Sequence, residues 1–170
     1  MLIPLFIGRL VSLMESVPGA RIALCAPTGK AAARLTESLR HNLSILAPAR
    51  ATPLAALEAR TLHRLLGYRG NTDTFRHNAG NPLPHDVVIV DEASMVDALM
   101  LDALLQALKP GARLMLVGDH HQLSSVDAGD VMGVLCRAAS APDGDPRLRA
   151  AVTQLTTSWR FQSEEGIGEL

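Results

Sequence analysis

Two adjacent acids, Asp91 and Glu92, directly follow the apolar run Val87–Val90. Four consecutive β-branched residues predict a strand that is buried on both faces of a parallel sheet. An aspartate at the end of such a strand can hold Mg²⁺, and an adjacent glutamate can orient and deprotonate an attacking water. The chemistry needs both acids because charge neutralisation and water activation are separate tasks. The alternative is a solvated helix start, where acids favour the helix dipole.

A second strand-and-acid segment repeats this arrangement farther along the chain. Leu114–Val117 leads into Gly118 and Asp119, and Gln122 follows three positions later. A carboxamide close to a γ-phosphate can donate to the phosphate or to water, and can thereby distinguish ATP from ADP. We therefore predict a site for magnesium and a nucleotide that uses both segments. The two histidines between Asp119 and Gln122 are interpreted as exposed loop residues, because no Cys or His spacing supplies partners for a zinc site.

The segment Ala26–Leu35 is predicted to contain a strand end, a loop and the start of a helix. Gly29-Lys30 looks like the end of a phosphate-binding loop. However, that loop requires a glycine five positions earlier and a hydroxyl directly after the lysine, and neither is present. Thr28, Lys30 and Arg34 at a helix start can still bind an anion, including a nucleic-acid phosphate. The alternative is an ordinary capped amphipathic helix.

Arg160 stands between Trp159 and Phe161. Flanking rings can hold an arginine rigidly enough for it to stabilise charge during phosphoryl transfer. The alternative is an arginine that stacks on Trp159 at the surface. By itself the segment favours this second interpretation.

The chain has a basic half and an acidic half, although its net charge is only −1. Residues 1–85 carry ten Lys and Arg against four Asp and Glu, whereas residues 86–170 carry six against thirteen. A basic half can face a phosphate backbone while an acidic half holds magnesium, although an uneven spread of surface charge gives the same counts. With 170 residues and 48% apolar composition, the chain can bury one core.

No secretion signal or membrane span is predicted, because the apolar run over residues 1–7 is too short. Cys25 and Cys136 are isolated in apolar surroundings. We interpret them as packed thiols of a protein in the reducing cytoplasm.

Hydrophobic periodicity, prolines and glycines divide the chain into alternating strands and helices. Strands are predicted over residues 21–26, 87–90, 113–117 and 152–155, and helices over 5–16, 30–39, 61–67, 97–108 and 128–138. Residues 44–60 are only loosely patterned, and residues 68–85 are predicted to form a surface loop or a hairpin insertion. This order predicts an α/β fold, a three-layer parallel sheet with helices on both faces. Because ligands of such sheets collect at the carboxyl ends of the strands, Ala26-Pro27, Asp91-Glu92 and Gly118-Asp119 should converge there.

Five segments resemble, in order and spacing, the first motor domain of the superfamily 1 helicases of the RecD type. They are APTGKAAARL (Ala26–Leu35), TLHRLLG (Thr61–Gly67), VIVDEASMVD (Val88–Asp97), LVGDHHQLSSVDAGDV (Leu116–Val131) and the segment Leu155–Leu170. These resemble motif Ia, the segment that follows it, and motifs II, III and IV of that family. The resemblance implies a partial RecA-like P-loop NTPase core over residues 1–170.

The resemblance also implies roles for individual residues. ATP and Mg²⁺ would be the cofactors, with Asp91 as the magnesium ligand and Glu92 as the general base. Gln122 would sense the γ-phosphate, Arg160 would stabilise the transition state, and Gly118 and Asp119 would also lie at the nucleotide. The residues implied to lie near DNA are Pro27, Thr28, Lys30, Arg34, Thr61 and His63.

The family implies a 5′–3′ DNA helicase, the alpha subunit of exodeoxyribonuclease V, that acts in recombination and double-strand-break repair. The implied partners are single-stranded DNA and the beta and gamma subunits of that enzyme, without a membrane. Two parts of the family pattern are not found: Met1-Leu2-Ile3-Pro4 stands where the GxxGxGKT loop is expected, and no second motor domain follows. We therefore expect a fragment that hydrolyses ATP poorly alone, although its full-length parent is a DNA-dependent ATPase. The alternative is a non-catalytic DNA-binding or assembly module whose binding depends on salt and not on ATP.

Overall fold

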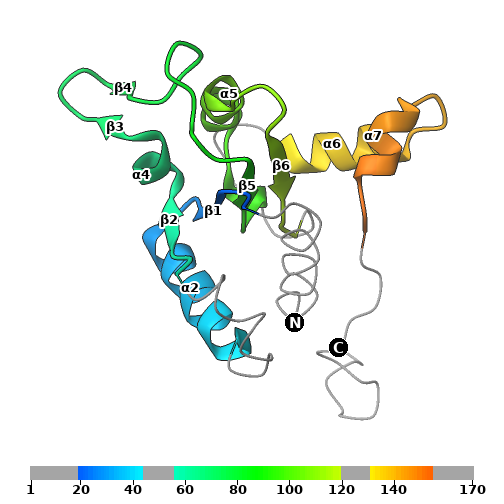
Figure 1. Ribbon diagram of the computed structural model, residues 1–170. Coiled ribbons are helices and arrows are strands. Elements are labelled where there is room, and N and C mark those ends of the chain that lie inside the picture. Colours follow the sequence, from blue (N-terminus) through cyan, green and yellow to red (C-terminus); the bar gives the residue numbers. More distant parts are fainter. Residues whose placement is uncertain (1–18, 44–55, 120–130, 155–170) are drawn as a thin grey trace, which may run out of the picture.

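A four-stranded parallel sheet is the centre of the part of the chain that the computed structural model describes, residues 19–43, 56–119 and 131–154. In spatial order its strands are β2 (Ala59–Thr61), β1 (Ile22–Ala26), β5 (Val87–Val90) and β6 (Arg113–Leu116) (Figure 1). The register places Leu24 opposite Ala59 on one side and opposite Ile89 on the other. Because all four strands run in the same direction, their carboxyl ends lie at one edge of the sheet.

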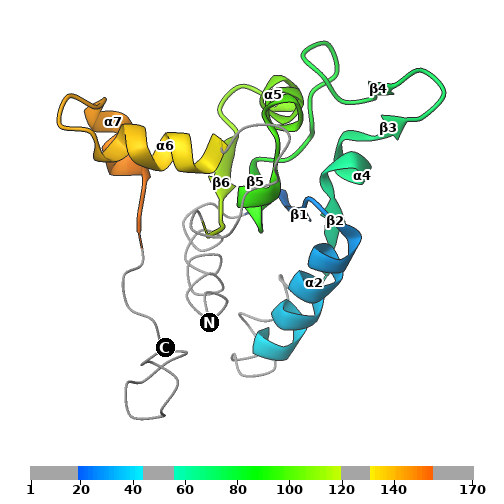
Figure 2. The same ribbon diagram turned by 180° about the vertical axis from the view of Figure 1, so that it is seen from behind.

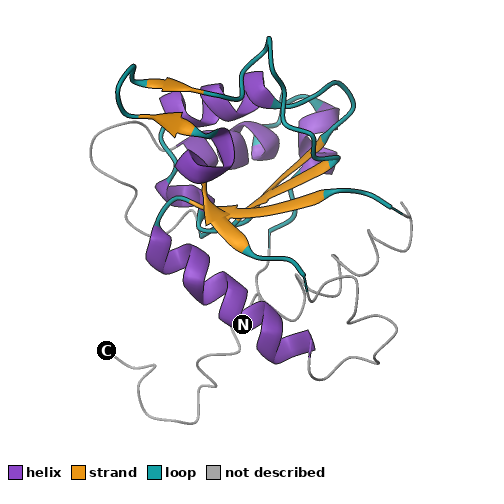
Figure 3. Cartoon of the chain, turned by 60° about the vertical axis from the view of Figure 1, so that its left-hand side comes forward, coloured by secondary structure: helices purple, strands orange, loops and turns teal. Residues whose placement is uncertain are grey.

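One face of the sheet is covered by the helix α2 (Gly29–Leu43). Successive side chains of a strand point to opposite faces, so the strands present Ile22, Leu24, Val87 and Ile89 on this side. The helix contributes Leu35, Leu39 and Leu43, whose four-residue spacing makes a single apolar stripe. Each leucine buried in this way stabilises the fold by about 1.5–3 kcal/mol. Figure 3 shows α2 along one side of the sheet and the shorter helices on the other.

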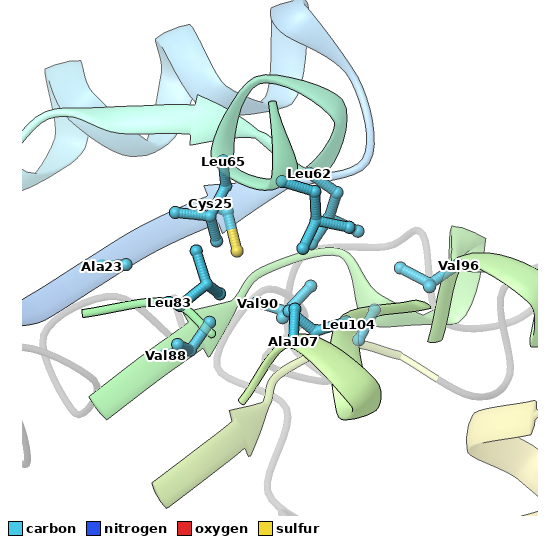
Figure 4. Close-up of a cluster of buried hydrophobic side chains, with 12 residues drawn as sticks. Ala23, Cys25, Leu62, Leu65, Leu83, Val88, Val90, Val96, Leu104 and Ala107 are labelled. Carbon is cyan, nitrogen blue, oxygen red and sulfur yellow. The ribbon is translucent and has the colours of Figure 1, made fainter. Parts of the chain in front are cut away.

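The helices α4 (Leu62–Leu66) and α5 (Ala98–Ala107) cover the opposite face. The strand residues that point to this side include Ala23, Val88 and Val90, and they meet the helices in a continuous apolar layer (Figure 4). Leu104 of α5 has no exposed surface. With helices packed on both faces of a parallel sheet, the predicted three-layer α/β fold is confirmed.

Cys25 is part of the same layer and is fully buried. Its thiol donates a hydrogen bond to the carbonyl oxygen of Ile89 at 3.2 Å. Burial disfavours the thiolate and raises the pKa of Cys25 to about 12. This residue is the packed, unreactive thiol that the sequence predicts.

The short helix α4 is defined by residues that stop it at both ends. Thr61 Oγ1 accepts a hydrogen bond from the amide of Arg64 at 3.2 Å, and Gly67 ends the helix with a left-handed φ of 68°. The chain then turns into an antiparallel hairpin of β3 (Tyr68–Arg69) and β4 (Thr74–Phe75). This hairpin lies beyond α4, on the β2 side of the sheet (Figure 1).

The amino ends of the strands are joined through Asp86. Its carboxylate accepts a hydrogen bond from the amide of Arg21 at 2.7 Å and forms an ion pair with Lys109, and its carbonyl oxygen accepts from the amide of Arg113 at 2.9 Å. The hydrogen bond from Lys109, followed by that from the Arg21 amide, lowers the pKa of Asp86. One residue therefore connects β1, β5 and β6 at the edge opposite their carboxyl ends.

His85 lies beside this junction with its Nδ1 atom buried and without a hydrogen-bond partner. Burial lowers the pKa of His85, and repulsion from Arg21, Arg60 and His77 lowers it further, while Asp86 has a smaller opposite effect. The folded protein therefore favours the neutral imidazole.

Several boundaries differ from the predicted ones. The helix α2 continues to Leu43, beyond the predicted end near residue 39, because Leu43 extends the buried stripe. The strand β2 begins at Ala59, at the end of the loosely patterned residues 44–60, and the helix α7 (Pro146–Ala151), which follows an Asp145 cap, is not among the predicted helices. The predicted strand over residues 152–155 is wrong in its described part, because residues 152–154 pair with no described strand. The predicted helix over residues 5–16 lies outside the described residues.

The remaining predicted elements are present with small shifts. The cap of α5 is Asp97, whose Oδ1 accepts a hydrogen bond from the amide of Met100 at 2.7 Å. The helix α6 (Val131–Ser140) and α7 lie beyond β6, on the opposite side of the sheet from β2 (Figures 1 and 2). Among the helices that the structure describes, none is both long enough and apolar enough to cross a membrane.

Candidate functional site

Backbone hydrogen bonds join the carboxyl ends of β1, β5 and β6 beyond the last strand residues. The amide of Asp91 donates to the carbonyl oxygen of Cys25 at 2.9 Å, and the amide of Val117 donates to Val90 at 2.8 Å. The amide of Ala93 then donates to the carbonyl oxygen of Val117 at 2.8 Å. The two acids that follow β5 are therefore held between the ends of its two neighbouring strands.

Asp91 occupies the centre of this edge. Its side chain is half-buried, and burial raises the pKa of its carboxyl group, with a hydrogen bond from the Glu92 amide acting in the opposite direction. No ion pair within the described ranges joins it to a basic side chain. A desolvated carboxylate without a cationic partner is a group that a divalent cation would stabilise.

Glu92 adopts a left-handed backbone conformation, with φ of 51° and ψ of 39°. This conformation costs a residue with a Cβ atom about 1–2 kcal/mol. It turns the chain from β5 into the short 3₁₀ helix η1 (Ala93–Met95), and the Glu92 carbonyl oxygen accepts from the Met95 amide at 3.0 Å. The surrounding hydrogen bonds maintain a strained turn at the position that the sequence assigns to the general base.

Gly118 packs closely against the turn that follows Glu92. A Cβ atom built at this position would lie 3.0 Å from the amide nitrogen of Ser94 and 3.1 Å from that of Ala93. It would also lie 2.9 Å from the sulfur of Met132 in α6. The segment that follows β6 therefore packs directly against the backbone of η1, and this favours a residue without a side chain. No local sequence signal points to Met132 or to this contact.

The start of α2 is a helix terminus with two exposed cations nearby. Thr28 Oγ1 accepts a hydrogen bond from the amide of Ala31 at 3.2 Å, so Thr28 is the N-cap. Lys30 and Arg34 are both exposed and are four residues apart, which places them on the same face of the helix. Pro27, which is half-buried, connects this helix to the end of β1.

Thr61 and His63 lie at the end of β2, next to the end of β1, where Thr61 pairs with Ala26. Thr61 is half-buried and caps α4, whereas His63 is exposed. The ring of His63 contacts the ring of Tyr68 edge to face, with centroids 5.4 Å apart. The predicted nucleic-acid residues therefore come from the starts of α2 and α4, which both follow carboxyl ends of strands.

The described residues contain only part of the predicted nucleotide site. Asp119 is half-buried directly after Gly118, whereas Gln122, Arg160 and the two histidines at residues 120–121 lie outside the described ranges. Within those ranges, no group of three or more His, Cys, Asp or Glu residues is arranged to hold a metal ion. A single carboxylate such as Asp91 still suits Mg²⁺, which is commonly bound by one or two carboxylates together with substrate phosphates and water.

Comparison with known proteins gives consistent matches over most of the chain. A family model described as an AAA domain matches residues 5–128. The RecBCD enzyme subunit RecD of Mycolicibacterium smegmatis is 47% identical over 154 residues, which are 90% of this chain and 26% of that protein. The same subunit of Mycobacterium tuberculosis is 49% identical over 144 residues, or 85% of this chain and 24% of that protein.

The ATP-dependent RecD2 DNA helicase of Deinococcus radiodurans is also similar, with 48% identity over 128 residues, or 75% of this chain and 15% of that protein. The chain thus spans about a quarter of the length of the two RecD subunits. The matched region of the AAA domain includes both acidic segments and the starts of α2 and α4.

Proposed function

The chain belongs to the AAA domain family, and on that premise we propose that it is part of the motor of an ATP-dependent DNA helicase of the RecD type. The observation that carries the proposal is the strained and half-buried pair Asp91 and Glu92, fixed between the ends of β1 and β6. An ordinary solvated strand end would need neither the left-handed turn nor the desolvated carboxylate. The names of the relatives, RecBCD enzyme subunit RecD and ATP-dependent RecD2 DNA helicase, support the same activity.

In this proposal Asp91 holds Mg²⁺ and Glu92 orients and deprotonates the attacking water. The bound metal and nucleotide would supply charge neutralisation at the transferred phosphoryl group. Gln122 as the sensor of the γ-phosphate and Arg160 as the stabiliser of the transition state remain predictions from the sequence. Gly118 contributes through its backbone, because its close approach to Ala93 keeps the turn at Glu92 in place.

The proposed nucleic-acid interface consists of the starts of α2 and α4. Lys30 and Arg34 supply two exposed positive charges on one face of α2, and the amides at the start of that helix favour an anion. Thr61 and His63 lie on the same edge of the sheet, after β2. We assign single-stranded DNA as the ligand and a RecBCD-type enzyme as the assembly of the parent protein, in line with the names of the relatives.

The proposal is tested by two binding experiments on the same samples. Fluorescence anisotropy with labelled oligothymidylate measures affinity against salt, and calorimetry measures Mg·ATP binding with and without that oligonucleotide. The salt slope is the slope of the logarithm of the binding constant against the logarithm of the salt concentration. Replacing both Lys30 and Arg34 by Ala should reduce its magnitude by about 0.7 for each lost phosphate contact. Arg147→Ala, at an exposed cation on α7, is the matched control and should leave the slope unchanged.

In the full-length parent protein, Asp91→Asn should abolish Mg·ATP binding and leave nucleotide-free DNA binding unchanged. Asp102→Asn, which neutralises an exposed acid on α5, is the matched control. Mg·ATP binding that survives Asp91→Asn would contradict the assigned metal ligand. DNA binding by the full-length parent that is sensitive to salt and accompanied by no Mg·ATP binding would instead favour the non-catalytic DNA-binding module.

A further inference from the structure

Three aromatic rings form a cluster where the hairpin meets α4. The ring centroids of Tyr68 and Phe75 are 5.7 Å apart. The ring centroid of His63 lies 5.4 Å from that of Tyr68 and 6.0 Å from that of Phe75. The three residues come from α4, β3 and β4, and we call them the aromatic platform. Tyr68 leaves 45% of its surface exposed, which makes it one of the largest apolar groups at the surface of the described residues.

The ring of Tyr68 is held in one orientation although it is not buried. Its hydroxyl donates a hydrogen bond to Asp73 at 2.7 Å, and its backbone pairs with Phe75 across the hairpin. The base of the hairpin is fixed by the amide of Arg76, which donates to the carbonyl oxygen of Gly67 at 3.1 Å. An exposed ring that is already ordered loses little conformational freedom when a ligand binds.

The segment that carries the aromatic platform is strongly basic. Four exposed arginines, Arg60, Arg64, Arg69 and Arg76, lie between residues 59 and 77, where Asp73 is the only acid. Asp73 accepts the hydroxyl of Tyr68, and none of the four arginines forms an ion pair within the described ranges.

Burial of the hairpin does not account for Tyr68. The underside of α4 is packed through Leu62, Leu65 and Leu66, and Phe75 is the hairpin ring that contacts this core. Tyr68 is not part of that contact. Its ring contacts the other two rings of the platform.

We propose that the aromatic platform binds an unpaired base of single-stranded DNA by stacking on Tyr68, while the neighbouring arginines contact the phosphates. Positive charge combined with exposed aromatic rings is the chemistry that recognises single strands without sequence preference. His63 links the platform to the start of α4. In this proposal the bound DNA strand continues from Thr61 onto the hairpin. The inference rests on the proposed function, because it extends the same DNA interface.

The test compares oligothymidylate with an oligonucleotide of the same length that lacks bases. Tyr68→Ala should weaken binding of oligothymidylate by about 5- to 160-fold, the range expected for loss of one base stack. It should leave binding of the abasic strand and the salt slope unchanged. Tyr68→Phe keeps the ring and should bind within about threefold of the unchanged protein.

Arg69→Gln is the complementary variant. It removes a phosphate contact, so it should weaken both strands equally and reduce the salt slope by about 0.7. A fluorescent 2-aminopurine base in the oligonucleotide gives an independent readout, because stacking on Tyr68 quenches its emission. That quenching should be present with the unchanged protein and with Tyr68→Phe, and absent with Tyr68→Ala.

The outcomes separate this inference from the proposed function. If the unchanged chain binds oligothymidylate and Tyr68→Ala binds it equally well, the platform is refuted and the DNA interface stands. If Tyr68→Ala weakens both strands equally and lowers the melting temperature, the ring has only a structural role and the platform is again refuted. If the unchanged chain binds neither strand at low salt, the DNA interface itself is refuted.

Discussion

Replacing Gly118 by Ala tests the contact that joins the two acidic segments. The added Cβ atom would lie 3.0–3.1 Å from two backbone nitrogens of η1, so residues 93 and 94 must move by a few tenths of an ångström. The third neighbour, the sulfur of Met132 at 2.9 Å, is the end of a flexible side chain and can move at little cost. Overpacking of this kind costs about 1–3 kcal/mol.

The free energy of unfolding is measured by urea titration followed by circular dichroism. We expect Gly118→Ala to lower it by about 1–3 kcal/mol. Gly29→Ala is the matched control, because a Cβ atom there meets nothing within 4 Å, and that variant should be neutral or slightly more stable. Adding Met132→Ala should not restore stability, because the backbone contacts remain. An equal free energy of unfolding for Gly118→Ala and the unchanged protein would refute the close approach of Gly118 to η1.

Four further predictions concern single side chains. In urea titrations, Leu104→Ala should lower the free energy of unfolding by about 2–5 kcal/mol, because Leu104 is fully buried. Leu99 lies on the same helix but is 81% exposed, so Leu99→Ala should change the free energy of unfolding by less than about 0.5 kcal/mol. Thr61→Ala should cost about 1 kcal/mol in the same assay through loss of the α4 cap, and Thr61→Ser should retain the cap. The pKa of His85 is lowered in the folded protein, so the stability gained from its neutral imidazole is complete above the ordinary histidine pKa. That stability is lost as the pH falls through the lowered pKa of the folded protein. The urea midpoint of unfolding should therefore fall less between about pH 7 and pH 5 in His85→Leu than in the unchanged protein. Glu92→Gly should be about 1 kcal/mol more stable than Glu92→Ala, because only glycine adopts the left-handed turn without strain. A Glu92→Ala variant that is equally or more stable in urea would contradict that backbone conformation.

The elements that the sequence predicts well are those with a strong local signal. The run Val87–Val90 forms β5 because four β-branched residues suit a strand that is buried on both faces. The helix α4 begins and ends at the predicted Thr61 and Gly67, since both caps act through hydrogen bonds within a few residues. Asp97 likewise caps α5 through the nearby amide of Met100.

The features that the sequence does not reveal depend on contacts between distant segments. The strand β2 has only three residues, one of them an arginine, and it forms because β1 offers it a partner. The close approach of Gly118 to η1 depends on where β6 ends relative to β5, and this cannot be obtained from either segment alone. The aromatic platform also cannot be seen from local sequence, because residues 68–85 contain few apolar residues and show no periodicity. Only the pairing of the hairpin strands brings Tyr68 and Phe75 together.

Two unfavourable features of the described structure lie next to each other at one edge of the sheet. The strands β1 and β5 are buried along their whole length, and their successive side chains pack on opposite faces of the sheet. At their carboxyl ends, by contrast, the structure maintains a left-handed glutamate and a desolvated aspartate in adjacent positions. A sequence selected for stability alone would remove both, because glycine and asparagine would relieve the strain and the buried charge. The packed sheet therefore supplies the stability that allows Asp91 and Glu92 to remain in a costly arrangement, and this is the physical argument for our proposal that the edge serves catalysis.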